Sequence, residues 1–244
     1  MDFFRSRASY ALGTATSESH SSASKFDFEK MTKAFEVVEH QFRTTTNPLP
    51  TTAHFIAAMQ QLCHLFDTLG SAFHFVKKDI DQKLTSLKHY AAHNPLEYAH
   101  IHNAIQYELK EGTVTSRNAQ LHNDFSFTRT LSRLMWALKF TDHLLGGLAQ
   151  AFAKDSPLSP ADRTLRWAVA RAYDDALAPH HSWTIRKTVK GACLLLPSKE
   201  AFMSKIGVKE EQHEHYLHRL GQSMTPLVQR MYAYYAQLEL LNLP

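Results

Sequence analysis

The chain has 244 residues, of which 44% are hydrophobic and 20% charged, a composition typical of a soluble globular protein with a substantial core. No apolar run approaches the roughly 20 residues needed to cross a bilayer, which excludes a membrane-spanning protein. The net charge of +4 mildly favours anionic partners, whether phosphate ligands, anionic membrane surfaces or nucleic acid. Cys63 and Cys193 lie in apolar helical patterns, so we expect reduced core thiols in a cytosolic protein.

The first 25 residues are polar and rich in Ser, Thr and Ala, and we expect a disordered tail there rather than a weak transit segment. From residue 26 to residue 244, apolar residues recur at the three- and four-residue steps of amphipathic helices. Neither a linker nor an internal repeat divides this pattern, so we expect a single all-α domain of about eight helices. The predicted helical regions span residues 26–42, 52–69, 73–91, 97–112, 125–153, 161–178, 181–195, 198–206 and 208–241.

Local signals set several of the predicted helix boundaries. Thr52 is a good N-cap for the second helical region, and Gly70 is a good stop. Ser159-Pro160 predicts the start of the helix near residue 161, because proline is favoured at the first helical position. Gly146-Gly147 is a candidate position for a bend in the preceding long helix.

The stretch FTRTLSRLMWALKF, residues 127–140, combines an apolar helical stripe with two arginines beside it. Arg129 and Arg133 are four residues apart, so their guanidinium groups leave the helix in nearly the same direction. Like charges at this spacing cost a few tenths of a kcal/mol in water and far more when buried without a partner. Taken alone, the pair is explained either by exposure to solvent or by an anionic ligand.

Two further segments place polar groups within apolar helical patterns. Asp79 and Lys83 are four residues apart, which taken alone predicts an ion pair on a helix surface. His181 and Trp183 stand at the start of another predicted helix, where capping and core packing would explain them.

The 16 histidines raise the question of a metal site. The densest cluster, HEHYLH from His213 to His218, lacks the HExxH spacing and a neighbouring set of Cys or carboxylate ligands, so a solvated helix face is favoured. There is no GxSxG motif, no Gly-rich phosphate loop and no CxxC pair. We therefore expect no catalytic residues, no metal and no cofactor.

Taken together, four segments in this order resemble the glycolipid transfer protein family. They are FDTLGSAFHFVKKDIDQKL, NAIQYELKEG, TRTLSRLMWALKF and ALAPHHSWTIRKTVKGACLLLPSKEAF, and the resemblance covers roughly residues 28–240. The combination is specific: an aspartate in a DI motif, an arginine-bearing helix, then H-x-W, an apolar run and Pro-x-x-x-x-Phe. The resemblance implies a two-layer all-α sandwich that encloses sphingolipid chains and moves the lipid between membranes without chemistry.

The resemblance also implies roles for individual residues. Asp79 matches the aspartate that accepts the amide N–H of the sphingoid backbone, and His181 matches the histidine that donates to the acyl-amide carbonyl. Trp183 is placed where the family is thought to touch the membrane, and the basic residues that follow it, Arg186, Lys187 and Lys190, would favour an anionic surface. The expected apolar lining for the chains includes Phe28, Phe35, Phe55, Phe66, Leu69, Val189 and Leu194.

The headgroup positions separate the branches of this family. Glycolipid-binding members carry Asn, Lys and a sugar-stacking Trp at positions that are Lys83, Ser86 and Arg133 here. Lys83, Arg129 and Arg133 instead resemble the ceramide-1-phosphate branch, in which three cations hold one phosphate. A phosphomonoester carries about −1.5 to −2 charges near neutral pH, which would offset the repulsion between the arginines. The empty site should then be a strained cluster of positive charge.

The function expected from the sequence is transfer of ceramide-1-phosphate or a related sphingolipid phosphate between membranes, by a cytosolic protein that contacts them transiently. Three alternatives stay open. The same fold could serve as a sphingolipid sensor, or it could carry a glycosphingolipid, since Trp136 lies close to the headgroup positions. An all-α scaffold that binds helices or nucleic acid ranks last, because the basic residues are scattered without interleaved aromatic residues.

Overall fold

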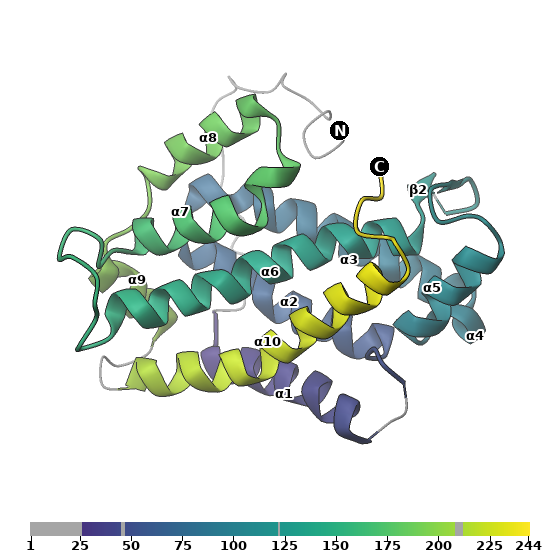
Figure 1. Ribbon diagram of the computed structural model, residues 1–244, viewed down its shortest axis with the longest axis horizontal. Coiled ribbons are helices and arrows are strands. Elements are labelled where there is room, and N and C mark those ends of the chain that lie inside the picture. The colour runs from purple at the N-terminus through teal and green to yellow at the C-terminus, as the bar shows by residue number, and fades with distance from the viewer. Residues whose placement is uncertain (1–25, 45–46, 122, 208–211) are drawn as a thin grey trace, which may run out of the picture.

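The computed structural model describes residues 26–44, 47–121, 123–207 and 212–244 (Figure 1). These residues form ten α-helices, two 3-10 helices and one antiparallel pair of two-residue strands, which confirms the predicted all-α class. The predicted disordered tail, residues 1–25, lies outside the described residues. The elements are α1 (Phe28–Thr44), α2 (Thr52–Thr68), η1 (Ser71–Phe73), α3 (His74–His93), α4 (Pro95–Tyr98), α5 (Ile101–Lys110), β1 (Arg117–Asn118), β2 (Asp124–Phe125), α6 (Phe127–Phe152), α7 (Leu165–Ala176), η2 (Ala178–His180), α8 (Trp183–Cys193), α9 (Lys199–Ile206) and α10 (His213–Gln237).

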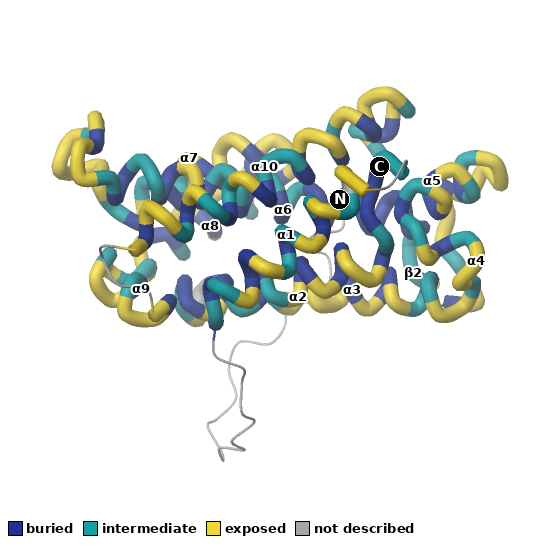
Figure 2. Tube along the Cα trace, turned by 90° about the horizontal axis from the view of Figure 1, so that it is seen from below, coloured by how far each residue is buried: buried dark blue, intermediate teal, exposed yellow. Residues whose placement is uncertain are grey.

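The helices form two layers, and the buried residues lie mainly where the layers face each other (Figure 2). One layer contains α6, α7 and α10, and the other contains α2 and α3. Helix α1 packs against α10 and α2 and so joins the layers along one side. The apolar stripe predicted on α6 faces this core, since Phe127, Leu131, Leu134 and Leu138 are fully buried. The two-layer helical sandwich expected from the sequence is therefore confirmed.

Helix α6 begins where it does because several groups satisfy its first backbone N–H groups. The Ser126 hydroxyl accepts a hydrogen bond from the Arg129 N–H at 3.1 Å. The Glu108 carboxylate, on α5, accepts from the N–H groups of Phe127 at 2.8 Å and Thr128 at 2.9 Å. A carboxylate at this end of a helix also complements the helix dipole. The start of α6, and the arginine of its first turn, are thus fixed from another helix.

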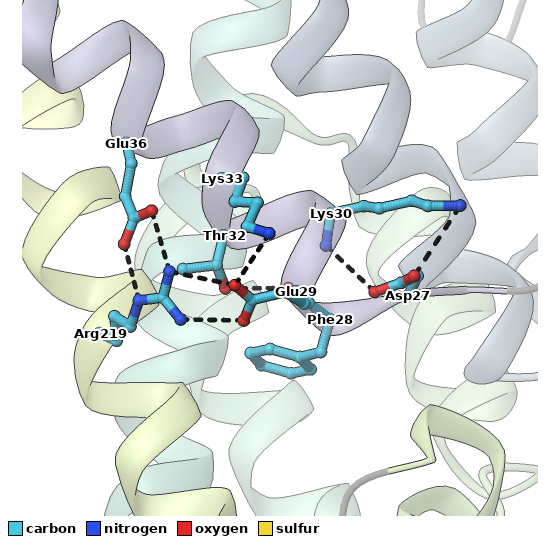
Figure 3. A network of polar contacts seen from close by, with 8 residues as sticks. All are labelled: Asp27, Phe28, Glu29, Lys30, Thr32, Lys33, Glu36 and Arg219. Atoms are coloured by element: carbon cyan, nitrogen blue, oxygen red, sulfur yellow. Dashed lines mark hydrogen bonds and ion pairs between the residues drawn. The ribbon is translucent and has the colours of Figure 1, made fainter.

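Polar contacts join α1 to α10 at the surface (Figure 3). The Arg219 guanidinium donates to the Glu36 carboxylate at 2.7 and 3.0 Å and to the Glu29 carboxylate at 2.8 and 3.2 Å. All three side chains are about one-third exposed, so these contacts fix the register of the two helices more than they stabilise the fold.

After helix α10, a capping turn reverses the direction of the chain. Glu239 adopts a positive φ of 58°, while Leu240 N donates to the Tyr235 carbonyl at 2.9 Å and Glu239 N donates to the Ala236 carbonyl at 3.1 Å. This pair of hydrogen bonds is the Schellman arrangement, in which the residue after the turn is usually apolar and buried. Leu240 meets that expectation at 6% exposed. The chain then passes over the first turns of α6 (Figure 1).

Two predicted boundaries near the start of α2 and within residues 97–112 were wrong. Thr51, not Thr52, is the N-cap of α2, and its side chain accepts from His54 N at 3.3 Å. The region predicted as one helix is split into α4 and α5, because His100 forms a β-bridge with Thr51. That bridge joins residues far apart in the chain, so helical periodicity gives no sign of it.

The predicted start of α7 was also wrong. The helix begins at Leu165, with the Thr164 side chain accepting from Trp167 N at 3.1 Å. The earlier candidate, Ser159, instead donates its hydroxyl to the Asp162 carboxylate at 2.7 Å within a turn. Threonine and serine are both good caps, and only the fold selects between them.

The glycine pair in α6 serves close packing. The helix continues through Gly146-Gly147 without interruption, so the pair does not end or split it. A Cβ atom added at Gly147 would lie 3.2 Å from the Ala168 Cβ and 3.3 Å from its Cα, whereas one at Gly146 would meet nothing within 4 Å. Gly147 therefore sets how closely α6 and α7 approach.

Candidate functional site

The two arginines of α6 lie together at the first two turns of the helix. Arg129 is only 7% exposed and Arg133 is half-buried. The Arg129 guanidinium carbon lies 3.3 Å from the centre of the Phe125 ring, and that of Arg133 lies 4.1 Å from the Trp136 ring. Aromatic faces stabilise guanidinium groups, so both cations are held in defined orientations.

Backbone carbonyls of the last residues complete the surroundings of these arginines. Arg129 Nε donates to the Pro244 carbonyl, and Arg133 Nη2 donates to the Leu243 carbonyl at 3.0 Å. Backbone oxygens of Leu243 and Pro244 thus accept from both guanidinium groups, and the expectation that the cluster of positive charge is strained stays a prediction. The residues that supply these oxygens lie more than 100 positions away in the sequence, and no local pattern pointed to them.

The third cation is paired on α3. Lys83 Nζ lies 2.5 Å from Asp79 Oδ1, and their side chains are 18% and 21% exposed. The predicted pair is thus present, but partly buried rather than on the surface. Burial is the largest influence on Lys83 and lowers its pKa, Asp79 opposes that shift, and Arg133 and Arg129 add to it. Lys83 is therefore close enough to both arginines for their charges to lower its pKa.

His181 follows η2 and is almost fully buried, at 5% exposed. Its Nδ1 lies 2.9 Å from the Tyr173 hydroxyl oxygen. Burial, together with the charges of His180 and Arg186, lowers the pKa of His181 to about 4, whereas burial raises the pKa of Tyr173 to about 12. At neutral pH the imidazole is uncharged and the phenol keeps its proton. Sequence reasoning did not assign Tyr173 a role.

Three of the predicted site residues line one cavity between the layers. Asp79, Arg133 and His181 supply its polar part, and almost all of the remaining lining is apolar. Such a lining suits a ligand with a small polar group and a long hydrocarbon part. The apolar lining consists of Phe66, Phe73, Phe75, Val76, Ile80, Ala137, Phe140, Val169, Leu177 and Val189, with Tyr173 beside His181.

The predicted lining residues divide into several groups. Phe66 and Val189 line the cavity. Phe35, Phe55 and Leu69 are core residues elsewhere, and Phe28 lines a separate apolar cavity near α9 and α10. The prediction for Leu194 was wrong, since this side chain is 63% exposed at the end of α8.

An exposed apolar group lies on α8 and directly after it. Trp183, Leu194 and Leu195 are 68%, 63% and 74% exposed. Lys187 Nζ lies 3.9 Å from the centre of the Trp183 ring. Trp183 thus does not serve core packing.

Trp136 has ring partners of its own. Its indole stacks on the His180 ring at 3.7 Å and 6°, and the Arg133 guanidinium lies against it as well. These contacts make Trp136 a packing residue of the site.

Other candidate features were also located. Among the described residues, no three His, Cys, Asp or Glu side chains are grouped to hold a metal ion, and no helix is long and apolar enough to cross a membrane. In the HEHYLH cluster, His215 and His218 are exposed, but His213 is buried and packs near Phe152 at 6.3 Å between ring centres. The solvated face predicted there was therefore wrong for His213.

Comparison with known proteins agrees with this architecture. Residues 50–208 match the family model "Glycolipid transfer protein (GLTP)". A ceramide-1-phosphate transfer protein from Danio rerio is 32% identical over 78% of this chain and 87% of its own length.

Two solved structures share the arrangement of helices. The apo form of mouse ceramide-1-phosphate transfer protein superposes with a TM-score of 0.75, at 24% identity, over 90% of this chain and 100% of that one. The human ceramide-1-phosphate transfer protein in complex with 12:0 ceramide-1-phosphate gives a TM-score of 0.74 at 25% identity, with the same coverage.

Proposed function

Because the chain belongs to the glycolipid transfer protein family, we propose that it binds ceramide-1-phosphate or a close sphingolipid phosphate and transfers it between membranes. One observation carries this proposal: Asp79, Arg133 and His181 stand at the polar part of a single apolar cavity. The protein then works by binding and release, without catalytic residues.

We assign the sphingolipid amide to Asp79 and His181. A carboxylate accepts the amide N–H, and a neutral imidazole donates to the amide carbonyl. When the Tyr173 hydroxyl donates to Nδ1 of His181, the uncharged ring carries its hydrogen on Nε2. The depressed pKa of His181 supports this role, because a neutral ring with a fixed tautomer offers one donor in a fixed direction.

We assign the phosphate to Lys83, Arg129 and Arg133. Guanidinium groups bind phosphate oxygens through charge-assisted, often bidentate hydrogen bonds, and an ammonium group adds a compact charge. The charges of Arg133 and Arg129 add to the larger effect of burial in lowering the pKa of Lys83, and this supports a site in which an added anion would be favoured.

The apolar cavity explains why a lipid would leave a membrane for this protein. Moving a lipid with about 30 chain CH2 groups into water costs roughly 25 kcal/mol, at about 0.8 kcal/mol per CH2. A carrier has to offset that cost with apolar lining, which the side chains of α2, α3, α6, α7 and α8 provide.

We further propose that the protein acts in the cytosol and touches membranes transiently through Trp183. Leu194 and Leu195 enlarge the apolar surface beside it, and Lys187 places a cation there that favours anionic lipids. We regard residues 26–244 as one domain, because no composition break divides them.

Vesicle-to-vesicle transfer of fluorescent ceramide-1-phosphate, measured beside fluorescent glucosylceramide, tests the function. Selective transfer of the phosphate lipid is expected. Transfer of the sugar lipid would contradict the headgroup assignment. Tight binding of ceramide-1-phosphate with negligible transfer would instead favour a sensor of the same fold.

Arg133→Leu should weaken ceramide-1-phosphate binding about tenfold or more, since a hydrogen bond to a charged group contributes about 1.5–3 kcal/mol. Far-ultraviolet circular dichroism should stay unchanged, because the substitution leaves the α6 core stripe intact. Arg171→Leu, on the exposed face of α7, removes the same charge away from the site and is the matched control. Equal affinity in both variants would contradict the phosphate assignment.

A further inference from the structure

We propose that residues 241–244 are an internal competitor of the lipid headgroup. Their backbone carbonyls occupy N–H groups of Arg129 and Arg133 that a phosphate would use, and phosphate binding displaces them. This inference rests on the proposed function, because it concerns the same headgroup site.

The competing segment is held at the site by structure of its own. The chain reversal at Glu239 and the buried side chain of Leu240 direct it back across α6. Leu241 and Leu243 are partly buried against the core. The carbonyls of Leu243 and Pro244 are therefore presented to the arginines by an anchored segment, not by chance contact of a loose tail.

The hydrogen-bond geometry makes the carbonyls and a phosphate competitors. The Nε atom of an arginine carries a single hydrogen, and on Arg129 the Pro244 carbonyl accepts it. A phosphate therefore cannot bind Arg129 in the bidentate mode that uses Nε and the neighbouring terminal nitrogen while this hydrogen bond is present. On Arg133 the Leu243 carbonyl accepts from Nη2. Carbonyl and phosphate oxygens are both acceptors and cannot bond to each other. A phosphate therefore has to replace the carbonyls at these N–H groups.

The same exchange assists release of the lipid. Each predicted phosphate-binding cation has an acceptor within the protein, since Lys83 is paired with Asp79 and both arginines donate to backbone oxygens. When a phosphate leaves, backbone oxygens again accept from both guanidinium groups and reduce the repulsion between them. A phosphomonoester carries about −1.5 to −2 charges, more than either backbone acceptor, so loading is still favourable.

Two variants test whether residues 241–244 compete with the lipid headgroup or instead help to hold it. One deletes residues 241–244. The other, Leu241→Gly with Leu243→Gly, keeps the chain length and removes the anchoring side chains. Asn242→Ala, at an exposed position, is the matched control. Affinity is measured with phosphatidylcholine vesicles that contain ceramide-1-phosphate with a 12-carbon acyl chain.

Both variants should bind the phosphate lipid about three- to tenfold more tightly than the full chain and release it more slowly, and the control should match the full chain. In the full chain, hydrogen exchange in residues 238–244 should accelerate when this lipid is added. Unchanged or weaker affinity in both variants, while the full chain binds, would overturn the competition alone. Absence of binding in every form would overturn the proposed function and this inference with it, whereas binding only by the variants would support the competition.

Discussion

At the scale of single residues, the neighbours of a side chain decide its chemistry here. His181 is uncharged near neutral pH because it is buried and lies near His180 and Arg186. The Tyr173 hydroxyl oxygen lies 2.9 Å from its Nδ1, so one hydrogen bond orients the ring. An isolated histidine would titrate near pH 6.5 and rotate, and it would be a poor fixed donor to an amide.

The depressed pKa of His181 predicts a pH dependence of stability. Between pH 6.5 and about 4 the unfolded chain binds a proton at this residue while the folded chain does not, so the free energy of unfolding falls as the pH falls through this window. The loss attributable to His181 should reach up to about 3 kcal/mol at the lower end. Urea unfolding at several pH values checks this, with His181→Gln as the comparison. An equal pH dependence in both proteins would contradict it.

At the scale of elements, α6 is held from several sides. Glu108 of α5 fixes its first turn, and α7 approaches closely at Gly147. The arginines of its first two turns are therefore carried by an element whose position is set by the whole helical sandwich.

The glycine pair of α6 gives a matched test of this packing. Gly147→Leu should destabilise the protein by several kcal/mol, because even a Cβ atom comes within 3.3 Å of the Ala168 backbone. Gly146→Ala should stabilise it by up to about 1 kcal/mol, since that position is open and alanine favours a helix. Thermal unfolding measures both changes, and similar effects at the two positions would contradict the close approach of α6 and α7.

The sequence predicted the helices better than their boundaries. Periodicity identified the long amphipathic helices because burial of one face dominates their stability. It missed the split between α4 and α5 and the short β1–β2 pair, which depend on contacts between residues distant in the chain. The spacing of four residues correctly paired Asp79 with Lys83.

The site was predictable to the same degree. Arg129 and Arg133 were placed together by helix geometry alone. Their acceptors, the carbonyls of Leu243 and Pro244, were not predictable, since backbone atoms leave no signature in the sequence. Tyr173 was missed because its hydrogen bond to His181 depends on how η2 returns the chain to α7.

At the scale of the whole molecule, transfer requires the protein to meet a membrane in a defined orientation. The exposed side chains of Trp183, Leu194 and Leu195 belong to α8 and the residues after it. Val189, on the same helix, lines the cavity. A membrane that contacts this surface would therefore be separated from the chain-binding cavity by a single helix.

Trp183→Ala should slow intervesicle transfer about tenfold while leaving the helix content unchanged, because an exposed indole contributes to membrane affinity and not to the core. The effect should be larger with vesicles that contain anionic lipid, since Lys187 would then act beside it. Thr184→Ala, an exposed substitution on the same helix, is the control. Transfer rates that do not differ between the two variants would contradict membrane contact at this residue.

Helix α6 sets the distance between the polar and the apolar parts of the cavity. Arg133 lies at the polar part of the cavity, and Ala137 and Phe140 of the same helix line its apolar part. Seven residues of α-helix rise about 10 Å, at 1.5 Å per residue. Backbone hydrogen bonds set that length, so the helix fixes the distance between the Arg133 and Phe140 positions. If the phosphate binds at Arg133 as proposed, the hydrocarbon of the lipid would have to begin within that distance of its headgroup.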